Sequence, residues 1–329
     1  MKDRWCQYTT LMTAFNSAKE RKSYHKIVMK YEANLSENLE DLLTRLDNGT
    51  YHPQPYREFY VYDPKTRLIQ APAFEDRIVH HALMGYIRPA IDRKLIYDTY
   101  ACRIGKGARA ASARMTHFVR GLPTGWALKI DVKKFFYSID HERINYHLTK
   151  IIPCDNTLNL LKMFYENPIG KGLPLGNATS QILANLALNP VDQYIKRELK
   201  IKRYIRYMDD MILLHEDREY LKECLKKIKK VLAIEKLEVN KRTNIRRVAT
   251  GVTFVGYRHF VTHTILKPAN ITKIRRALKA ANNRETVVSY LAFAKGTASF
   301  PLVVKLAREA APDAIPVIQK FAQKHRKAA

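Results

Sequence analysis

The sequence lacks the features that would anchor a protein in a membrane or cross-link it covalently. It has no run of about 18 apolar residues, and its N-terminus begins with charged and polar residues, so neither a membrane span nor a signal peptide is predicted. The four cysteines lie far apart without C-x-x-C spacing, which argues against a zinc site and a disulfide framework: Cys6, Cys102, Cys154 and Cys224. We therefore expect reduced, structural cysteines in a cytoplasmic protein.

Acidic residues are also scarce. The chain holds 58 Lys and Arg against 31 Asp and Glu, which gives a formal net charge of +27 and a pI near 9.9. Such an excess indicates a polyanionic partner, and without a membrane signal we expect that partner to be nucleic acid. The 329 residues, 46% of them hydrophobic, suffice for two or three packed subdomains, and they contain no internal repeat or low-complexity tract.

Residues 207–210 (Tyr-Met-Asp-Asp) place two adjacent carboxylates between two short apolar runs, residues 204–208 and 211–214. This pattern predicts a β-hairpin with the acids at its tip. Rigid, adjacent carboxylates suit two Mg²⁺ ions about 3.5–4 Å apart, which can clamp the attacking and leaving oxygens of a phosphoryl transfer. On these four residues alone, an ordinary Asp-Asp turn explains the pattern equally well.

A third carboxylate, Asp131, closes the alternating stretch 127–131, which predicts a strand ahead of a helix that starts near residue 138 or 140. At a strand end, Asp131 can face the acids of the hairpin in the same sheet. Taken alone, it is more typical of an acid that approaches or caps a helix. Phe135 and Phe136 follow, and because adjacent residues point in different directions, we expect one in the core and the other facing a site.

Two basic segments come earlier in the chain. Residues 56–72 are rich in aromatic and β-branched residues around Asp-Pro-Lys, which predicts a hairpin with Lys65 and Arg67 near its tip or on its second strand. These cations either grip a triphosphate or belong to a solvated strand face. The loop 100–107 offers backbone amides and a cation, Arg103 or Lys106, to a phosphate backbone, although its spacing fits no nucleotide-binding fingerprint.

Apolar residues at helical spacing predict further helices, and residues 1 to about 55 read as mainly helical. The clearest segments are residues 36–46 before an Asn-Gly turn, 76–91, 181–200 and the basic, amphipathic 220–231. We expect Ser36 to cap the first of these helices, Ser180 to cap the third and Pro190 to bend it. Residues 254–257 (Phe-Val-Gly-Tyr) predict a second tight hairpin.

The C-terminal part of the chain, from Thr264 to the end, is the most basic. It holds 13 Lys and Arg against 3 acids and keeps a helical pattern, with residues 261–268 as its entry. A helical surface that is merely solvated would not need so lopsided a charge balance. We therefore expect a separate helical subdomain that contacts duplex phosphates.

Taken in order, these motifs resemble those of reverse transcriptases along nearly the whole chain. Asp131 in Asp-Val-Lys-Lys-Phe-Phe resembles the first metal-binding motif, residues 175–181 the loop under the nucleotide, and residues 207–210 the catalytic hairpin. Lys241 and residues 254–257 match the next two motifs. Five motifs in the order and spacing of one family are far more specific than any one of them.

The resemblance implies an α+β fold, a right-hand polymerase with fingers, a palm with an antiparallel sheet and helices, and a small helical thumb. The fingers would comprise residues 1–125 with an N-terminal helical extension, the palm 126–262, with 145–175 contributing to the fingers, and the basic thumb 263–329. The implied activity is that of an RNA-directed DNA polymerase with two Mg²⁺ ions, or Mn²⁺, as cofactors. Its implied partners are template RNA, RNA/cDNA duplex and dNTPs.

The resemblance also implies roles for individual residues. The implied catalytic acids and metal ligands are Asp131, Asp209 and Asp210, with Val132 as a further metal ligand. The implied nucleotide contacts, among which Phe136 is the steric gate against a ribose 2′-hydroxyl, are Lys65, Arg67, Val132, Phe136, Leu175, Gly176, Gln181 and Lys241. The implied nucleic-acid contacts are Arg103, Lys106, Tyr207, Met208, Gly256 and Tyr257.

The closer resemblance is to reverse transcriptases of diversity-generating retroelements. Most relatives have Gln-Gly in the nucleotide loop and close it with Ser-Pro, whereas this chain has Leu175-Gly176 and Ser180-Gln181, as that group does. Residues 56–59, 99–103 and 254–257 are similar to theirs as well. We also expect no endonuclease or RNase H segment after the thumb, and the sequence has no retron-like Val-Thr-Gly after the hairpin.

Membership of that group would imply error-prone, adenine-mutagenised cDNA, a structured template RNA and a small accessory variability protein oligomer, in a bacterial, archaeal or phage-encoded system. Leu175 offers the incoming nucleotide no directional hydrogen bond, which predicts discrimination looser by about 1–3 kcal/mol, unless the side chain only packs the loop. Two other classes stay open. One is another bacterial reverse transcriptase, retron-like or defence-associated, including one that works without a template; the other is a non-catalytic RNA-binding relative.

Overall fold

The computed structural model describes residues 5–62, 65–280, 283–311, 316 and 318–319. The chain forms two compact units that interleave along the sequence. The first comprises Met1–Arg103, Asp131–Lys200 and Leu225–Lys241, and the second comprises Ile104–Ile130, Ile201–Cys224 and Arg242–Ala329. Helix α11 (Arg218–Ile234) runs from the second unit into the first, and it contains the predicted basic helix of residues 220–231.

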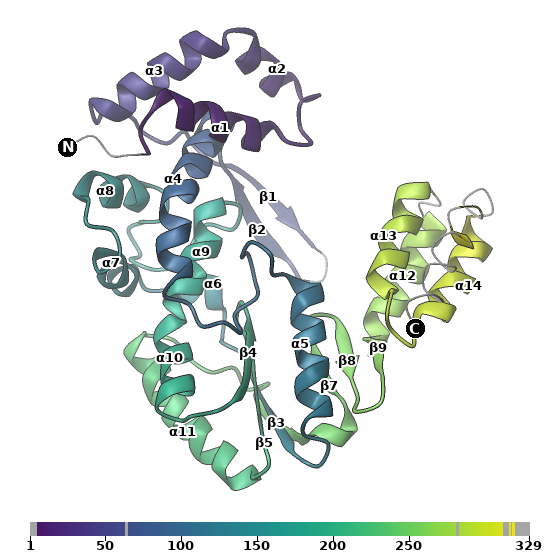
Figure 1. Cartoon of the computed structure of the whole chain (residues 1–329). Helices are drawn as coiled ribbons and strands as arrows, with labels where there is room; N and C mark the ends of the chain where they lie inside the picture. Colours follow the sequence, from purple (N-terminus) through teal and green to yellow (C-terminus); the bar gives the residue numbers. More distant parts are fainter. Residues whose placement is uncertain (1–4, 63–64, 281–282, 312–315, 317, 320–329) are drawn as a thin grey trace. The chain divides into compact units, whose positions relative to one another are not determined.

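Helix α4 (Phe74–Asp92) is the central element of the first unit (Figure 1). It packs against α1 (Tyr8–Lys19) and α9 (Ala178–Ala187) through a fully buried apolar face that includes Ile78, Leu83 and Ile87. The predicted helix 76–91 is thus confirmed. The other elements of this unit are α2 (Lys26–Ala33), α3 (Leu35–Asp47), α6 (Phe135–Ser138), α7 (His141–Thr149), α8 (Asp155–Met163), α10 (Asn189–Arg197) and the paired strands β1 (Arg57–Val61) and β2 (Arg67–Ala71).

The N-terminal region is helical as predicted, but the expected cap is wrong. Helix α3 begins at Leu35, its N-cap residue is Asn34, and no side-chain hydrogen bond caps it, so Ser36 does not have the predicted role. A cap contributes about 1 kcal/mol, whereas burial of a leucine side chain contributes about 1.5–3 kcal/mol. Because Leu39 and Leu42 are fully buried, burial rather than capping determines where this helix forms.

The predicted single helix over residues 181–200 is two helices, α9 and α10. Pro190 lies in the first turn of α10, where its missing amide breaks the helix instead of bending it. The predicted cap is also wrong, because α9 begins at Ala178 and Ser180 lies inside its first turn, buried. The helix start predicted near residue 140 is confirmed, since α7 begins at His141 and the Asp140 carboxylate accepts the backbone N–H of Arg143 at 3.1 Å.

The second unit contains a four-stranded antiparallel sheet in the order β4-β5-β3-β6. Its strands are β3 (Trp126–Ile130), β4 (Arg203–Tyr207), β5 (Asp210–His215) and β6 (Asn244–Arg247). The central strands are buried, with Leu128, Ile130, Met211, Ile212 and Leu213 fully inaccessible to solvent. The predicted strand 127–131 is confirmed, with its end one residue earlier than predicted, since Asp131 is the residue directly after β3.

A second sheet of this unit has the order β7-β8-β9, with β7 (Val252–Phe254), β8 (Tyr257–His259) and β9 (Thr264–Leu266). The turn η1 (Val248–Thr250) precedes it, and helix α5 (Ala108–Arg120) packs against β4, β7 and β8. The predicted C-terminal helices are α12 (Pro268–Ala280), α13 (Arg284–Ala294) and α14 (Phe300–Ala310), drawn in yellow-green in Figure 1. They share one core around Leu278, Leu291 and Val303.

Candidate active site

The two acids predicted at a hairpin tip lie at one. Strands β4 and β5 pair antiparallel up to Tyr207 and Asp210, which leaves Met208 and Asp209 as a two-residue turn. Met208 has φ +52°, in the left-handed region that favours glycine, so this turn is held in a strained conformation. Arg206, which is fully buried, donates a hydrogen bond from Nη1 to the carbonyl oxygen of Met208 at 3.1 Å and supports the turn.

Asp210, the first residue of β5, is held by a cation that no sequence motif indicated. Lys129 Nζ lies 2.7 Å from Asp210 Oδ2 and also donates to the carbonyl oxygen of Thr253 at 3.2 Å, which connects β3 to β7. Lys129 pairs in register with Ile212, so it sits diagonally across from Asp210 on neighbouring strands. The alternation of residues 127–131 was the available signal, because it places Lys129 on the same face of the strand as residue 131.

Asp131 and Val132 lie in the first unit beside the segment that leads to Lys241. The carbonyl oxygen of Asp131 accepts the backbone N–H of Asn240 at 2.7 Å. Val132, which is buried, forms an isolated antiparallel bridge with Val239. Two residues predicted to contact metal and nucleotide are therefore brought close to Lys241, an exposed cation one position beyond Asn240.

The predicted nucleotide loop is fastened to the first unit at its start, through Leu175 and through Leu173 just before it. The carbonyl oxygen of Leu175 accepts the backbone N–H of Gln70, on β2, at 2.8 Å. Two residues earlier, the N–H of Leu173 donates to the carbonyl oxygen of Phe136 at 2.8 Å. The loop thus joins the strand that carries Arg67 to the short helix α6 that carries Phe136, and the β1–β2 hairpin predicted from the sequence is confirmed.

Gly176 is required by this close approach. Its φ is +142°, and a Cβ at this position would lie 2.3 Å from the carbonyl oxygen of Gln70. Any side chain would therefore push the loop away from β2. Nearby, Phe135 is buried and Phe136 half-buried, with rings in edge-to-face contact at 5.6 Å, so the predicted division of this pair is confirmed as far as burial goes.

The remaining predicted nucleotide contacts differ in how far their side chains are exposed to solvent. Lys65, Arg67 and Gln181 are exposed, whereas the Leu175 side chain is half-buried. Behind the loop, Asn177 is buried and donates from Nδ2 to the Tyr56 hydroxyl at 2.7 Å and to the carbonyl oxygen of Phe164 at 3.1 Å. Neither Asn177 nor Tyr56 was predicted to have this role, although Tyr56 opens one of the segments that carried the resemblance.

A buried histidine supports the first turn of α9. His80 Nδ1 lies 3.1 Å from Thr179 Oγ1, and its ring is 4.0 Å from that of Phe164 between centroids. Burial lowers the pKa of His80 to about 3, so the imidazole is neutral near pH 7. The hydrogen bond and the ring contact therefore join α4 to the base of the nucleotide loop without introducing a charge.

Two predicted nucleic-acid contacts are engaged inside the protein. Arg103 donates from Nε to Asp92 at 3.0 Å and from Nη1 to the carbonyl oxygens of Ile96 and Thr99, so its guanidinium is bound to the end of α4 and the segment that follows it. Tyr257 is buried in the core of the C-terminal helices, and its hydroxyl donates to the carbonyl oxygen of Phe293 at 2.9 Å. The side chain of Tyr257 is thus not accessible to a nucleic acid in this arrangement.

The hairpin 254–257 itself is confirmed. Phe254 pairs with Tyr257, and the two turn residues have φ values of +42° for Val255 and +89° for Gly256. Gly256 also accepts the N–H of Lys267 at 3.0 Å, and a Cβ there would meet Asn270 Nδ2 at 2.8 Å. A glycine is needed at this turn for both reasons.

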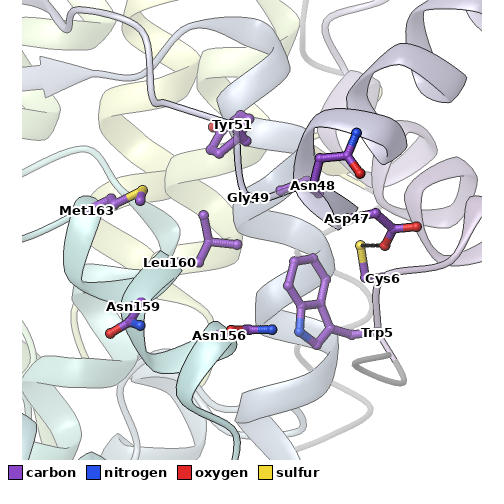
Figure 2. A pocket seen from close by; sticks show the side chains of 11 residues that line it. Trp5, Cys6, Asp47, Asn48, Gly49, Tyr51, Asn156, Asn159, Leu160 and Met163 are labelled. Atoms are coloured by element: carbon purple, nitrogen blue, oxygen red, sulfur yellow. Dashed lines mark hydrogen bonds between the residues drawn. The ribbon is translucent and has the colours of Figure 1, made fainter. Parts of the chain in front are cut away.

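The clearest hollow among the described residues lies elsewhere in the first unit (Figure 2). It has a volume of about 550 Å³, and none of the predicted site residues lines it. At its edge, the Trp5 indole N–H donates to Thr157 Oγ1 at 2.9 Å, and the Cys6 thiol donates to Asp47 Oδ1 at 3.4 Å. The indole and thiol donors are thus engaged within the protein, and the hollow has no link to the predicted chemistry.

The described residues contain no group of three or more His, Cys, Asp or Glu side chains placed to hold one metal ion. All four cysteines are free thiols. In the same part of the chain, no helix is both long and apolar enough to cross a membrane.

Comparison with known proteins identifies the family. The profile of the reverse transcriptase (RNA-dependent DNA polymerase) family matches residues 62–259. The chain is 24% identical over 278 residues to protein YkfC of Escherichia coli, which covers 69% of this chain and 72% of YkfC. It is 25% identical over 178 residues to the group II intron-encoded protein LtrA of Lactococcus lactis, which covers 50% of this chain and 29% of LtrA.

Solved structures agree at the level of fold. Apo telomerase from Candida tropicalis superposes with a TM-score of 0.55 at 10% identity, covering 90% of this chain and 63% of that one. Telomerase from Candida albicans in complex with a fragment of telomeric RNA gives 0.56 at 11% identity, covering 83% and 58%. The right-hand polymerase fold predicted from the sequence is confirmed. Because the family profile matches more than half of the chain, this protein belongs to the reverse transcriptase family.

Proposed function

We propose that this protein is an RNA-directed DNA polymerase that extends a primer on an RNA template. The observation that carries the proposal is the register of β3 and β5, in which Ile130 pairs with Met211. Asp131 directly follows Ile130 and Asp210 directly precedes Met211, and consecutive Cα atoms are about 3.8 Å apart. With Asp209 in the adjoining turn, we assign these three carboxylates the catalytic role.

The donor atoms of these residues suit a pair of divalent ions by their chemistry, although no three acids among the described residues converge on one point. Asp131, Asp209 and Asp210 offer carboxylate oxygens and Val132 a carbonyl oxygen, which are the ligands that Mg²⁺ and Mn²⁺ prefer. When bound, such ions lower the pKa of a primer 3′-hydroxyl and neutralise charge on the triphosphate. The protein's own contribution is rigidity, because Lys129 holds the Asp210 carboxylate.

Around these acids we assign the nucleotide contacts. Lys65, Arg67 and Lys241, all exposed, would neutralise the triphosphate. The half-buried ring of Phe136 would exclude a ribose 2′-hydroxyl, which selects deoxynucleotides. Gln181 and the loop at Leu175 and Gly176, tied to β2 through Gln70, would form the floor under the incoming base.

For the nucleic acid we propose contacts from Lys106, Tyr207 and Met208 and from the backbone of the 254–257 hairpin. The fingers, palm and thumb would follow the boundaries 1–125, 126–262 and 263–329, with 145–175 joining the fingers. Among the fold relatives, the Candida albicans telomerase is solved with a fragment of telomeric RNA, which supports RNA as a partner here. The cytoplasm, which we expected from the sequence, is the location that we propose for the enzyme.

A primer-extension assay on an RNA template tests the activity. We expect Asp209→Asn to abolish extension, because a metal-binding carboxylate is removed, while binding of RNA is unchanged. Glu216→Gln is the matched control, since it removes an exposed carboxylate just beyond β5 and should keep full activity. Primer extension by Asp209→Asn would refute the catalytic assignment. If the natural chain forms product without a template, the activity is untemplated nucleotide addition and not templated synthesis.

Within the family we propose an enzyme of the diversity-generating retroelement type, making error-prone, adenine-mutagenised cDNA with a small accessory protein oligomer. Leu175 supports the low fidelity in this proposal, because its backbone is anchored to Gln70 while its half-buried apolar side chain offers no hydrogen bond. The adenine selectivity does not follow from Leu175. The likeness to LtrA favours a second candidate, an enzyme of the group II intron type. The two differ in fidelity.

Sequencing of the cDNA separates them. We expect frequent errors opposite template adenines from the natural chain and roughly tenfold fewer errors overall from Leu175→Gln, which corresponds to about 1.4 kcal/mol of added discrimination. Leu175→Met, which stays apolar, should keep the natural error rate. A low error rate in the natural chain would favour the intron-type enzyme, and an unchanged rate in Leu175→Gln would mean that this side chain only packs the loop.

A further inference from the structure

Helix α11 carries a row of lysines that the proposed catalytic cycle does not use. Its 17 residues contain six basic side chains and two acidic ones, Glu219 and Glu223. Leu221, Cys224, Ile228 and Leu232 are buried and form the inner face. At 3.6 residues per turn, Lys222, Lys226, Lys229 and Lys230 fall together on the opposite side, and all are exposed.

Most of this lysine row is not neutralised by the protein. Lys222 bonds to Glu219 at 2.8 Å, a pair three positions apart. Within the described residues, no carboxylate lies within ion-pair distance of Lys226, Lys229 or Lys230. Lys226 and Lys230 are four positions apart, and like charges at this spacing destabilise a helix by about 0.2–0.5 kcal/mol.

The helix dipole does not account for these lysines. Cations stabilise a helix mainly in its last turn, and the last turn of α11 contains no basic residue. A helix face that is only solvated usually carries charges of alternating sign. The stretch Lys-Lys-Ile-Lys-Lys at 226–230 carries positive charges alone. The concentrated charge instead fits a partner that is itself densely and negatively charged.

We propose that the lysine row of α11, residues 222, 226, 229 and 230, binds the phosphate backbone of double-stranded segments in the template RNA. Between residues 222 and 230, α11 contains no aromatic side chain on which an unpaired base could stack, and no arginine that could anchor a protein partner. A duplex presents closely spaced phosphates and hides its bases, so point charges suffice to hold it. This inference rests on the proposed function, since it names a surface for the same template RNA.

Two double variants of the full-length chain test the surface. Lys226→Gln/Lys230→Gln removes two charges from the lysine row. Lys26→Gln/Lys30→Gln is the matched control, because it removes two exposed lysines at the same four-residue spacing from helix α2. Binding is measured to a long RNA hairpin, to single-stranded polyuridine and to polyglutamate over a series of salt concentrations, after thermal melting shows that both variants are folded.

We expect the α11 variant to bind the RNA hairpin about five- to tenfold more weakly and to lower the slope of log K against log salt by about 2, because each of the two substitutions removes one lysine from a phosphate. The α2 control should match the natural chain, and Lys226→Arg/Lys230→Arg should keep full affinity. Equal reductions in affinity in the two double glutamine variants would overturn the proposal. An equal reduction for polyuridine or polyglutamate would overturn the choice of duplex RNA and indicate a single strand or an acidic protein instead.

Primer extension on a short, unstructured template separates this inference from the proposed function. The α11 variant should extend such a template as the natural chain does. If the natural chain extends it and the two double variants bind the hairpin equally, only the surface is assigned wrongly. If the natural chain extends nothing while the α11 variant still binds the hairpin more weakly, the polymerase activity is refuted and the RNA surface stands.

Discussion

The catalytic hairpin and the nucleotide loop are built in different ways. In the hairpin, Asp209 and Asp210 are positioned by neighbours in sequence, because β4 and β5 pair across a two-residue turn. In the loop, Leu175 and Gly176 are positioned by Gln70 on β2, and Asn177 by Tyr56, both far earlier in the chain. A site of this kind can therefore combine a locally encoded catalytic turn with a substrate loop that depends on long-range packing.

The largest expected effect is a break in the loop. Gly176→Ala introduces a Cβ 2.3 Å from the carbonyl oxygen of Gln70 at a φ of +142°, so the loop must move or lose its bond to β2. We expect primer extension to fall at least about 100-fold, because misplacement of substrate by about 1 Å can have that effect. Gly170→Ala, at φ +70° with open space around it, is the control for backbone strain alone. Equal activity in both variants would contradict the role of the close approach.

A smaller effect is expected where the hairpin does rely on a distant residue. Lys129→Met removes the cation beside Asp210 and leaves its carboxylate without that anchor. We expect kcat to fall about tenfold while KM for the nucleotide changes little, since Lys129 positions Asp210 and does not touch the substrate. Lys129→Arg should recover part of the rate. A larger change in KM than in kcat would show that Lys129 contacts substrate directly.

Acid should weaken the support of the loop. The pKa of His80 is lowered to about 3 by burial, against about 6.5 in an unfolded chain, so the unfolded state binds more protons between these values. Stability contributed by neutral His80 is therefore lost as pH falls below about 6.5, by up to about 1.4 kcal/mol per pH unit. Denaturant unfolding at pH 7, 6 and 5 measures how the free energy of unfolding changes with pH. His80→Gln should reduce this pH dependence by the equivalent of about one bound proton. An unchanged slope would exclude His80.

The same titration offers a comparison with the second unit. His259 is also buried, lies 3.0 Å from Thr116 Oγ1 through Nδ1, and has its pKa lowered to about 4 by burial. His259→Gln should thus reduce the acid sensitivity as His80→Gln does, although only His80 packs under the nucleotide loop. We expect activity at pH 7 to change more in His80→Gln than in His259→Gln.

The smallest effect is expected inside the catalytic turn. Met208→Gly removes the steric strain of a φ of +52°, which stabilises the folded state by about 1 kcal/mol. It also raises the conformational entropy of the unfolded chain, which destabilises the fold by a similar amount. The free energy of unfolding should therefore stay within about 0.5 kcal/mol of that of the natural chain. A decrease of more than about 2 kcal/mol would show that the methionine side chain, and not the turn geometry, holds the hairpin.

Local patterns led to correct predictions where the determining contacts are local. The hairpins at 207–210 and 254–257, the helix at 76–91 and the helix start at Asp140 all follow from residues within a few positions of one another. The wrong predictions concern residues whose position depends on tertiary packing and not on neighbours in sequence. Ser180 has the chemistry of a cap, yet α9 begins before it and buries it, and Pro190 divides a segment that was expected to bend. Arg103 and Tyr257 are engaged internally, which their types alone do not indicate.

By itself, the sequence determined the charge of this protein, its pairs of short strands and the acids at their ends, because these depend on composition and on neighbours along the chain. Only the tertiary structure decided that Lys129 holds Asp210, that Gln70 holds the nucleotide loop, and that Gly176 must lack a side chain. Each of these is a contact between residues far apart in sequence. Its strength depends on the distance that packing sets between two groups, and no local preference of either residue carries that information.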